Sequence, residues 1–411
     1  MKIRQQPEDF QVEELATVRP TGGPYALYRL TKRSLTTPDA VDRVLQAFNL
    51  PRQTASYGGL KDRHAITVQY LTVRGGPARS VAQNLVKAEF LGAVDQPFKP
   101  AMIEGNRFEV VMRDLSMADL KAASAAAKEA RLDGLPNYFD DQRFGSMSAG
   151  GEFIARAWID GDYERALWLV FAEPYPHDPA GEARERATLR EHWGKWDRCK
   201  AMLARSHRRS IVTYLCDHPT DFRNAWALHR PDMRSLYLAA YQSALWNRML
   251  SALIEARLPA ASLRPVPLRI GPMAFFGPLT DAQRAGLVDE TLPLPSARLH
   301  LDADHAVRPL LDRVLAQDGI TLEKLKVKHP RDVYFARSWR RAIVPVTDLT
   351  TRARPDELQP GRQALSLRFT LGRGSYATLL VKRLTVAAGI EAAQEPAAED
   401  IESSSEPAES S

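Results

Sequence analysis

Cysteine is nearly absent from this chain. Its 411 residues include only Cys199 and Cys216, which are too few for a disulfide framework and form no CxxC pair. No apolar run is long enough to span a membrane, and the start, MKIRQQPEDF, contains no apolar signal segment. Together these absences predict a protein of a reducing compartment, and we expect it in the cytoplasm.

The familiar motifs of metal and nucleotide chemistry are also missing. The sequence has no HExxH, GxSxG, Walker A or Rossmann pattern. Its nine histidines are scattered, and the close pairs Cys216–His218 and His300–His305 do not have the ligand spacing of a structural metal site. We therefore expect neither a metal nor another cofactor. A metal-dependent nuclease is disfavoured because clustered acidic ligands are lacking.

Positive charge dominates most of the chain. The formal net charge is +6, but residues 389–411 carry seven acidic side chains and no Lys or Arg, which leaves 56 basic and 43 acidic residues, or +13, on residues 1–388. A basic protein suits a polyanion, because each neutralised phosphate releases counterions. Many basic proteins bind no nucleic acid, however, so charge alone leaves this question open. The acidic terminal segment is predicted to be disordered.

Hydrophobic periodicity predicts both helices and strands in the first 150 residues. Thr37 is the expected N-cap of the first helix, with Pro38 at its first position, and Ser116 and Asp119 have capping-box spacing. Strands are expected within 11–33 and at 55–57, 65–73 and 106–115, and helices at 36–50, 80–90 and 117–131.

The rest of the chain has a different pattern. Residues 152–257 are predicted to be mostly helical, and 235–258 should form a long helix that is apolar around much of its circumference and therefore buried. Residues 304–319 also have a helical pattern, which Pro309 is expected to disturb. Residues 363–384 are predicted as a strand, a glycine loop and a helix.

A single carboxylate stands between two cations in the stretch YGGLKDRHAITVQYLTV. The glycine pair allows a tight turn or a close approach to a ligand. Lys61 and Arg63 would favour the ionised form of Asp62 and could contact flanking phosphates. An exposed ion-pair turn explains the same residues. This stretch alone does not decide between a catalytic carboxylate and a surface turn.

Two later stretches combine amide, aromatic and basic side chains. In LPNYFDDQRFGS, Asn137 can read a base edge, Phe139 can stack on a base and Arg143 can hold a phosphate. In GRGSYATLLVKRL, Tyr376 is expected to open a helix behind a glycine loop, an arrangement that attracts anions. An aromatic core cluster explains the first stretch equally well. A further stretch, KRSLTT, suits a capped helix start, which leaves its two leading cations unexplained.

Six stretches occur in the order and approximate spacing of one enzyme family: PEDFQVEEL, KRSLTT, YGGLKDRHAITVQYLTV, NYFDDQRFG, YQSALWN and GSYATLLVKRL. Through them the chain resembles the TruD family of tRNA pseudouridine synthases over residues 4–386, apart from much of the middle region. The resemblance implies an RNA isomerase that converts uridine to pseudouridine, typically at the thirteenth nucleotide of tRNA, without cofactor or metal. It implies tRNA as the partner, with other RNAs left open. We expect a monomer that needs neither a protein partner nor a membrane.

The resemblance also implies a fold. The expected class is α+β: a pseudouridine synthase fold, with a mixed and largely antiparallel sheet, interrupted by the family's α/β insertion (TRUD) domain. An RNA cleft should lie between the two. Accordingly, 1–150 and 343–388 are expected to form the catalytic domain, 151–342 the insertion domain and 389–411 the disordered acidic tail.

Site residues follow from the resemblance position by position. The family's catalytic aspartate falls on Asp62, and positions that contact the RNA or line the active site fall on Phe10, Asn137, Phe139 and Tyr376. The aspartate would attack C1′ of the ribose or abstract the C2′ proton, and the residues do not decide between the two.

Basic residues complete the expected site. Arg4 falls where the family commonly carries a basic residue near the catalytic carboxylate. With Lys61 and Arg63, it would keep that carboxylate ionised and contact the RNA.

The chain departs from the family pattern near the pocket. Gly58 stands where alanine is frequent, LGRGSYAT replaces a proline-rich motif, and Asp140 and Asp141 follow NYF where glycine is usual. These changes affect the shape of the pocket and leave its catalytic group in place. The alternative function is a non-catalytic RNA-binding or RNA-folding protein on the same scaffold, against which the intact GLKDRHA argues.

Overall fold

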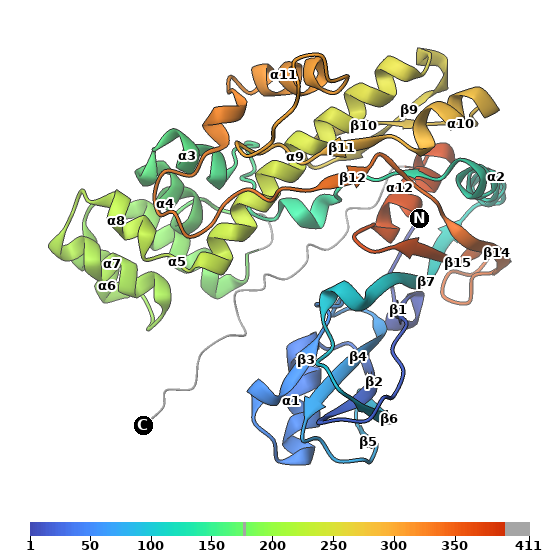
Figure 1. The fold of residues 1–411 in the computed structure, drawn as a ribbon, viewed down its shortest axis with the longest axis horizontal. Coiled ribbons are helices and arrows are strands. Elements are labelled where there is room, and N and C mark those ends of the chain that lie inside the picture. Colours follow the sequence, from blue (N-terminus) through green and yellow to red (C-terminus); the bar gives the residue numbers. More distant parts are fainter. Residues whose placement is uncertain (176–177, 391–411) are drawn as a thin grey trace.

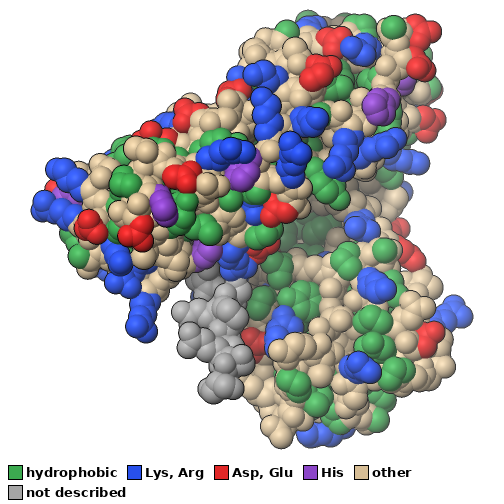
Figure 2. Space-filling view, turned by 60° about the vertical axis from the view of Figure 1, so that its left-hand side comes forward, with side chains coloured by type: hydrophobic (Ala, Val, Ile, Leu, Met, Phe, Trp, Pro, Cys, Tyr) green, Lys and Arg blue, Asp and Glu red, His purple; other side chains and the backbone are tan. Residues whose placement is uncertain are grey.

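A computed structural model describes residues 1–175 and 178–390 of the chain. A lobe built on one long sheet stands beside a mainly helical lobe (Figure 1), and in the view of Figure 2 a hollow lies between the helical lobe and the end of the sheet lobe formed by residues 25–94. Residues 391–411, nearly all of the expected acidic tail, lie outside the described residues. Within the described part, no helix combines the length and apolar character needed to cross a membrane.

Within the described residues, nine strands form one sheet in the order β14-β15-β7-β1-β4-β2-β6-β5, with β3 paired to β4. The β1–β4 pair is parallel and the other pairs are antiparallel. This mixed, largely antiparallel sheet with helices confirms the predicted fold class. The strands are β1 (Phe10–Ala16), β2 (Tyr25–Arg33), β3 (Ala55–Tyr57), β4 (Ile66–Arg74), β5 (Val81–Gln83), β6 (Val86–Val94), β7 (Ile103–Leu115), β14 (Thr347–Pro355) and β15 (Gln363–Gly372).

Helices cover the sheet on its apolar sides. α2 (Met117–Asp133) and α12 (Ala377–Ala387) pack against each other, and the alternate residues Leu365, Leu367 and Phe369 of β15 join their core. α1 (Thr37–Phe48) shares a second core with β2, β4 and β6. The other face of β7, β15 and β14 carries polar side chains, as expected for an antiparallel sheet with one solvated face.

The helical lobe lies between β8 (Leu135–Pro136) and β13 (Ile343–Val344), two strands that pair with each other. Its centre is the largely buried α9 (Pro231–Arg257), so the long buried helix and the helical pattern of 152–257 are confirmed. The other helices are α3 (Ile154–Asp160), α4 (Tyr163–Phe171), α5 (Ala180–Glu191), α6 (Trp196–Met202), α7 (His207–Asp217), α8 (Phe222–Ala227), α10 (Asp281–Val288) and α11 (Arg308–Gln317).

Short elements complete the chain. Two small sheets of the helical lobe pair β9 (Leu263–Leu268) with β10 (Gly271–Phe276) and β11 (Thr291–Pro293) with β12 (Trp339–Arg341). Single 3₁₀ turns are η1 (Pro7–Asp9), η2 (Arg52–Thr54), η3 (Pro100–Met102), η4 (Asp141–Phe144), η5 (Ala260–Ser262) and η6 (Leu322–Leu325).

The predicted helix at 80–90 is wrong. This segment forms the hairpin β5–β6 instead. Val86 and Ala88, two residues apart on β6, are buried in the core beside β2. Tertiary pairing with β2 therefore overrides the helical pattern of the isolated segment.

Two predictions at helix starts also need correction. Thr36, not Thr37, caps α1, and its Oγ1 accepts a hydrogen bond from the backbone N of Asp39 at 3.2 Å. Pro309 does not disturb α11, because it lies in the first turn, where no backbone N–H is required for the helix. The capping box of Ser116 and Asp119 is confirmed.

Candidate active site

The loop between β3 and β4 carries Asp62, and residues of neighbouring elements hold its backbone. Oγ1 of Thr37 accepts a hydrogen bond from the backbone N of Lys61 at 3.0 Å and donates to Oε1 of Gln69 at 3.0 Å. Nε2 of Gln69 donates to the carbonyl of Gly59 at 3.1 Å. Thr37 and Gln69 are both buried. Thr37 thus serves the loop and not the helix cap that the sequence suggested.

Lys32 of β2 supports the same loop. Its ammonium donates to the carbonyl of Asp62 at 2.6 Å and to that of Leu35 at 2.7 Å, and the residue is fully buried. Burial lowers the pKa of Lys32 to about 8, although the negative charge of Asp62 opposes this shift. This contact accounts for the first of the two cations in KRSLTT that a helix cap leaves unexplained.

The carboxylate of Asp62 is oriented on one side and open on the other. Oδ1 accepts a hydrogen bond from the backbone N of His64 at 3.0 Å, and Oδ2 lies 3.0 Å from Nη2 of Arg4. The Asp62 side chain keeps 24% of its surface exposed, so a ligand can reach it. A carboxylate in this state can act as a nucleophile or as a base.

Arg4 is itself held by its neighbours. Its guanidinium Cζ lies 4.2 Å from the ring centroid of Phe10. Its backbone φ is +55°, in the left-handed region that residues other than glycine seldom adopt. Such outliers persist where the surrounding structure holds them, often at functional sites. The structure therefore brings Arg4, Phe10 and Asp62 together.

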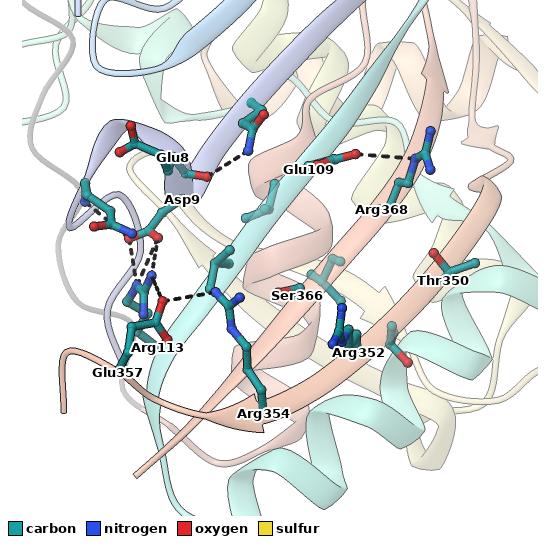
Figure 3. Close-up of a pocket in the computed structure, with 16 residues that line it drawn as sticks. Glu8, Asp9, Glu109, Arg113, Thr350, Arg352, Arg354, Glu357, Ser366 and Arg368 are labelled. Atoms are coloured by element: carbon teal, nitrogen blue, oxygen red, sulfur yellow. Dashed lines mark hydrogen bonds and ion pairs between the residues drawn. The ribbon is translucent and has the colours of Figure 1, made fainter. Parts of the chain in front are cut away.

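A buried arginine anchors the N-terminal segment that carries Arg4. Arg113 of β7 donates to the carboxylate of Asp9 at 2.8 and 2.9 Å, to Asp356 at 2.9 Å and to Glu357 at 3.0 Å. Figure 3 shows Arg113 between Asp9 and Glu357. The backbones of Lys2 and Arg113 also exchange two hydrogen bonds. These contacts tie η1 to β7 and to the end of β14.

The Lys61 side chain is bonded to residues other than Asp62. Its ammonium lies 3.0 Å from Oε2 of Glu14 and donates to Oδ1 of Asn106 at 2.7 Å. Lys61 and Asp62, although adjacent in the loop, therefore have different partners. Arg63 is exposed. Arg4, from a distant part of the sequence, is a cation that does contact Asp62.

A second group of predicted residues forms where the helical lobe meets the start of α12. Nδ2 of Asn137 donates to the carbonyl of Arg341 at 3.0 Å, and its Oδ1 accepts from Nη2 of Arg340 at 2.5 Å and from Oγ of Ser375 at 3.2 Å. Asn137 is buried. Its amide, expected to read a base, is bonded to protein groups here and positions Arg340.

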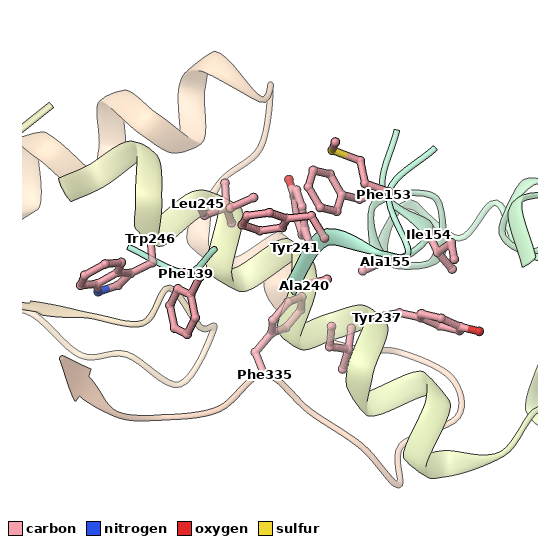
Figure 4. Packing of buried hydrophobic residues seen from close by; sticks show 14 of the residues in the cluster. Phe139, Phe153, Ile154, Ala155, Tyr237, Ala240, Tyr241, Leu245, Trp246 and Phe335 are labelled. Atoms are coloured by element: carbon pink, nitrogen blue, oxygen red, sulfur yellow. The ribbon is translucent and has the colours of Figure 1, made fainter. Parts of the chain in front are cut away.

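Phe139 lies at the edge of the core of the helical lobe, beside Trp246 of α9 (Figure 4). The ring centroids of Phe139 and Trp246 are 5.6 Å apart, and those of Phe139 and Tyr376 are 6.3 Å apart, both edge to face. Phe139 thus belongs partly to the core, as the alternative interpretation held. Tyr376 is the half-buried N-cap residue of α12, which confirms the predicted helix start.

Two arginines flank Phe139. The guanidinium Cζ of Arg340 lies 4.3 Å from the ring centroid and that of Arg143 lies 5.6 Å from it. Neither has an ion-pair partner among the described residues; Arg340 donates to the carbonyls of Asn137 and Gly374. Burial lowers the pKa of Arg340 to about 10, and the charge of Arg143 contributes in the same direction. Two guanidinium groups without carboxylates favour an anion beside them.

The strand pair β7–β15 connects the two groups. Asn106, which accepts from Lys61, lies opposite Leu371 in this pair. Just after β15, the backbone N of Arg373 donates to the carbonyl of Glu104 at 3.2 Å. The chain then reaches Tyr376 and α12. Both groups therefore adjoin the end of this strand pair from which α12 begins.

Two of the departures from the family pattern, Gly58 and Asp140, fit the residues that surround them. A Cβ on Gly58 would lie 2.5 Å from Cδ1 of Ile103 and 2.9 Å from Cε1 of Phe98, so these side chains occupy the space of an alanine methyl group. The buried Asp140 accepts hydrogen bonds from Thr378 and from Lys382 of α12. Burial alone would lower the pKa of Lys382, but Asp140 and Asp141 raise it above its usual value.

An open groove on the sheet is separate from these groups. Arg352, Arg354 and Arg368 line it on β14 and β15 (Figure 3). Gln11 lines the groove, whereas Phe10, its neighbour on β1, faces Arg4. Because successive side chains of a strand point to opposite faces, the groove and Asp62 lie on opposite faces of the sheet. Among the described residues, no three His, Cys, Asp or Glu side chains are grouped to hold a metal ion.

Sequence reasoning missed three residues around the two groups: Lys32, Gln69 and Arg340. Lys32 had a signal, as a cation that the helix cap does not explain. Gln69 also had one, because it is the only side-chain amide within the predicted strand 65–73. Arg340 had no local signal, since its contact with Asn137 depends on the pairing of β8 with β13.

The chain is similar in sequence and in fold to proteins of one family. The sequence profile described as "tRNA pseudouridine synthase D (TruD)" matches residues 1–265 and 280–384. A Methanococcus maripaludis protein named probable tRNA pseudouridine synthase D 1 is 28% identical over 400 residues, covering 93% of this chain and 99% of its own. The Aquifex aeolicus tRNA pseudouridine synthase D is 28% identical over 393 residues, covering 93% and 98%. A crystal structure of the putative tRNA pseudouridine synthase D (TruD) from Methanosarcina mazei has the same fold, with a TM-score of 0.71. The two sequences are 23% identical, and the match covers 95% of this chain and 93% of that one.

Proposed function

Because the chain belongs to the tRNA pseudouridine synthase D (TruD) family, we propose that it converts uridine 13 of tRNA to pseudouridine, with Asp62 as the catalytic group. As a member, it is an isomerase that acts on RNA. The observation that carries the proposal is the Asp62 carboxylate, which contacts Arg4 at 3.0 Å and is open on one side. Buried Lys32 and Thr37 hold the loop behind it. A surface ion-pair turn would need no such support.

The reaction needs an ionised carboxylate next to the ribose. The bond between N1 and C1′ breaks, the uracil turns, and C5 bonds to C1′ and then loses its proton. Asp62 either attacks C1′, which gives a covalent adduct, or takes the C2′ proton, which gives a glycal. In both routes the uracil leaves with the bonding electrons. Arg4, with its Nη2 3.0 Å from Oδ2 of Asp62, orients the carboxylate oxygens.

The second group supports a role in holding the nucleotide. A uridine within folded RNA must leave its stack before the reaction. The half-buried Tyr376 offers aromatic surface for the extruded base, and Phe139 lies beside it. Arg340 and Arg143, which lack ion-pair partners among the described residues, would hold a neighbouring phosphate. Asn137 positions Arg340 and stays our proposed contact to the uridine.

The paired entry and exit strands support the domain division. β8 and β13 lie side by side, so the chain leaves the sheet lobe and returns to it at one place. We infer that 151–342 form an inserted domain, that 1–150 and 343–388 form the catalytic domain, and that the enzyme acts on tRNA as a monomer.

Release of tritium tests the proposal. The wild-type enzyme and Asp62→Asn would each be incubated with tRNA transcripts that carry 5-³H-uridine, with EDTA present. Because C5 exchanges its hydrogen for the bond to C1′, each turnover releases one tritium. We expect release by the wild type only, and equal binding of tRNA by both proteins.

A transcript with cytidine in place of uridine 13 is the matched control and should release no tritium. Release from this transcript would show that the target is another position. Release by Asp62→Asn would remove Asp62 from its role. Binding without release from any tRNA would favour the non-catalytic RNA-binding alternative.

A further inference from the structure

The segment 324–341, called here the basic strip, runs along the helical lobe to the second group of the site. From η6 it passes α4, follows α9 and ends in β12 (Figure 1). Nε2 of Gln242 on α9 donates to the carbonyl of Ala336 at 2.8 Å, and Arg234 lies 2.6 Å from Asp332. Buried Phe335 packs near α9 (Figure 4). The strip is therefore a fixed surface.

Two large aromatic side chains of the basic strip are exposed, and the guanidinium Cζ of Arg298 lies 4.1 Å from the ring centroid of Tyr334 on one face. Tyr334 is 61% exposed and Trp339 is 47% exposed. Tyr334 stands between buried Val333 and Phe335, so anchoring of its neighbours turns its ring outward. Such rings usually contribute to a core, and exposed aromatic rings on a basic surface are the stacking platforms of proteins that bind single-stranded nucleic acid.

Cations accompany these rings. Lys324, Lys326, Lys328, Arg337 and Arg341 are exposed, and within the described chain none of them has an ion-pair partner. Elsewhere in the helical lobe, arginines commonly pair with carboxylates. Figure 2 shows Lys and Arg side chains gathered on the helical lobe beside the hollow. Cations without carboxylate partners can neutralise phosphates without first breaking an ion pair.

The basic strip leads directly to the predicted pocket. Its last residues are Arg340, which lies over Phe139 at 4.3 Å, and Arg341, whose carbonyl accepts from Asn137. An RNA strand whose target nucleotide is held at Phe139 can therefore continue along the basic strip.

We propose that the basic strip binds unpaired nucleotides that flank the target uridine, with Trp339 and Tyr334 stacking on bases and the strip's lysines and arginines holding phosphates. This inference rests on the proposed function. The two rings are five residues apart, about 17 Å in an extended chain, so they serve separate positions of the strand. The substrate must then present unpaired RNA beside the target, which a continuous duplex cannot do.

Equilibrium binding tests this inference. All proteins would carry Asp62→Asn, so that the RNA is not converted, and tRNA affinity would be measured over a range of salt concentrations. We expect Trp339→Ala and Tyr334→Ala each to weaken binding about fivefold or more, since stacking is lost, and Trp339→Phe to keep most of the affinity. Lys326→Ala combined with Lys328→Ala should reduce the slope of log Kd against log salt by about 1.4.

Lys121→Ala combined with Lys128→Ala is the matched control, because these exposed lysines lie on α2, away from the basic strip. This pair should change neither affinity nor slope appreciably. If the strip variants bind like this control while the wild type still forms pseudouridine, the inference is overturned and the proposed function stands. If the wild type forms no pseudouridine in any tRNA, the proposed function fails, whatever the strip variants do.

Discussion

Arg4 and Lys32 contact different groups of Asp62. Arg4 contacts the Asp62 carboxylate, and Lys32 binds the Asp62 backbone carbonyl. The first contact orients the reacting atoms, whereas the second holds the loop that carries them. Removal of each residue should therefore affect a different property of the enzyme.

Replacing Arg4 should impair the chemical step. Arg4→Met removes the cation 3.0 Å from Asp62 and frees the carboxylate to rotate, and a misplaced reacting group costs roughly 100-fold in rate. Arg4→Lys keeps the charge but loses the planar group over Phe10, so an intermediate rate is expected. Single-turnover tritium release at saturating tRNA measures this. A rate of Arg4→Met within twofold of the wild type would contradict the positioning role.

Lys32 should make stability depend on alkaline pH. Burial lowers its pKa to about 8 in the folded protein, whereas an unfolded lysine titrates near 10.4. Between these values the unfolded chain binds more protons, so the contribution of Lys32 to the free energy of unfolding rises with pH. Below about pH 8 the full penalty of burying the charge remains.

Urea denaturation at pH 7.5 and pH 10 measures this effect. Relative to Lys32→Met, the wild type should gain on the order of 2 kcal/mol between the two pH values. The exposed Lys87 of β6 is the control, and Lys87→Met should not alter the pH dependence. An equal pH dependence of the wild type and Lys32→Met would refute the prediction.

Between elements, the Asp62 loop is fitted to the start of β7. A Cβ on Gly58 would lie 2.5 Å from Cδ1 of Ile103, so Gly58→Ala should lower the free energy of unfolding by about 1–3 kcal/mol through overpacking. Ile103→Val removes that Cδ1 and should recover most of the loss in the double variant. Thermal unfolding of the four proteins in a double-mutant cycle measures the coupling. If the effects of the two substitutions are additive, Ile103 is not the residue that excludes a larger side chain at position 58.

Helices and strands could be predicted where a pattern within the segment itself indicates them. The capping box of α2 and the apolar circumference of α9 are local patterns, and both predictions are confirmed. The segment 80–90 failed because its apolar spacing suits a helix, while β2 offers it a partner strand. Strand pairing depends on residues far away in sequence, so a single segment does not reveal it.

For the whole molecule, charge should govern affinity for RNA. Residues 391–411 contain seven acidic residues and no basic one, and they lie outside the described residues. Deleting residues 389–411 should leave the fold intact and tighten tRNA binding, by roughly threefold at low salt, because the negative charge repels phosphates. The difference should vanish at high salt. Affinities that are equal at low salt would show that this segment does not compete with RNA.

The family, the enzyme class and the aspartate that we propose as catalytic could be inferred without any structure, because motifs such as GLKDRHA are short runs of adjacent residues. The fold, in contrast, sets which groups surround these motifs. It assigned Arg4 to Asp62 and Lys61 to Glu14, turned Thr37 and Lys32 toward the loop, and brought Arg340 to Asn137. These contacts join residues that are distant along the chain. Their side-chain directions depend on strand pairing and on the packing of one lobe against the other, which no local pattern contains.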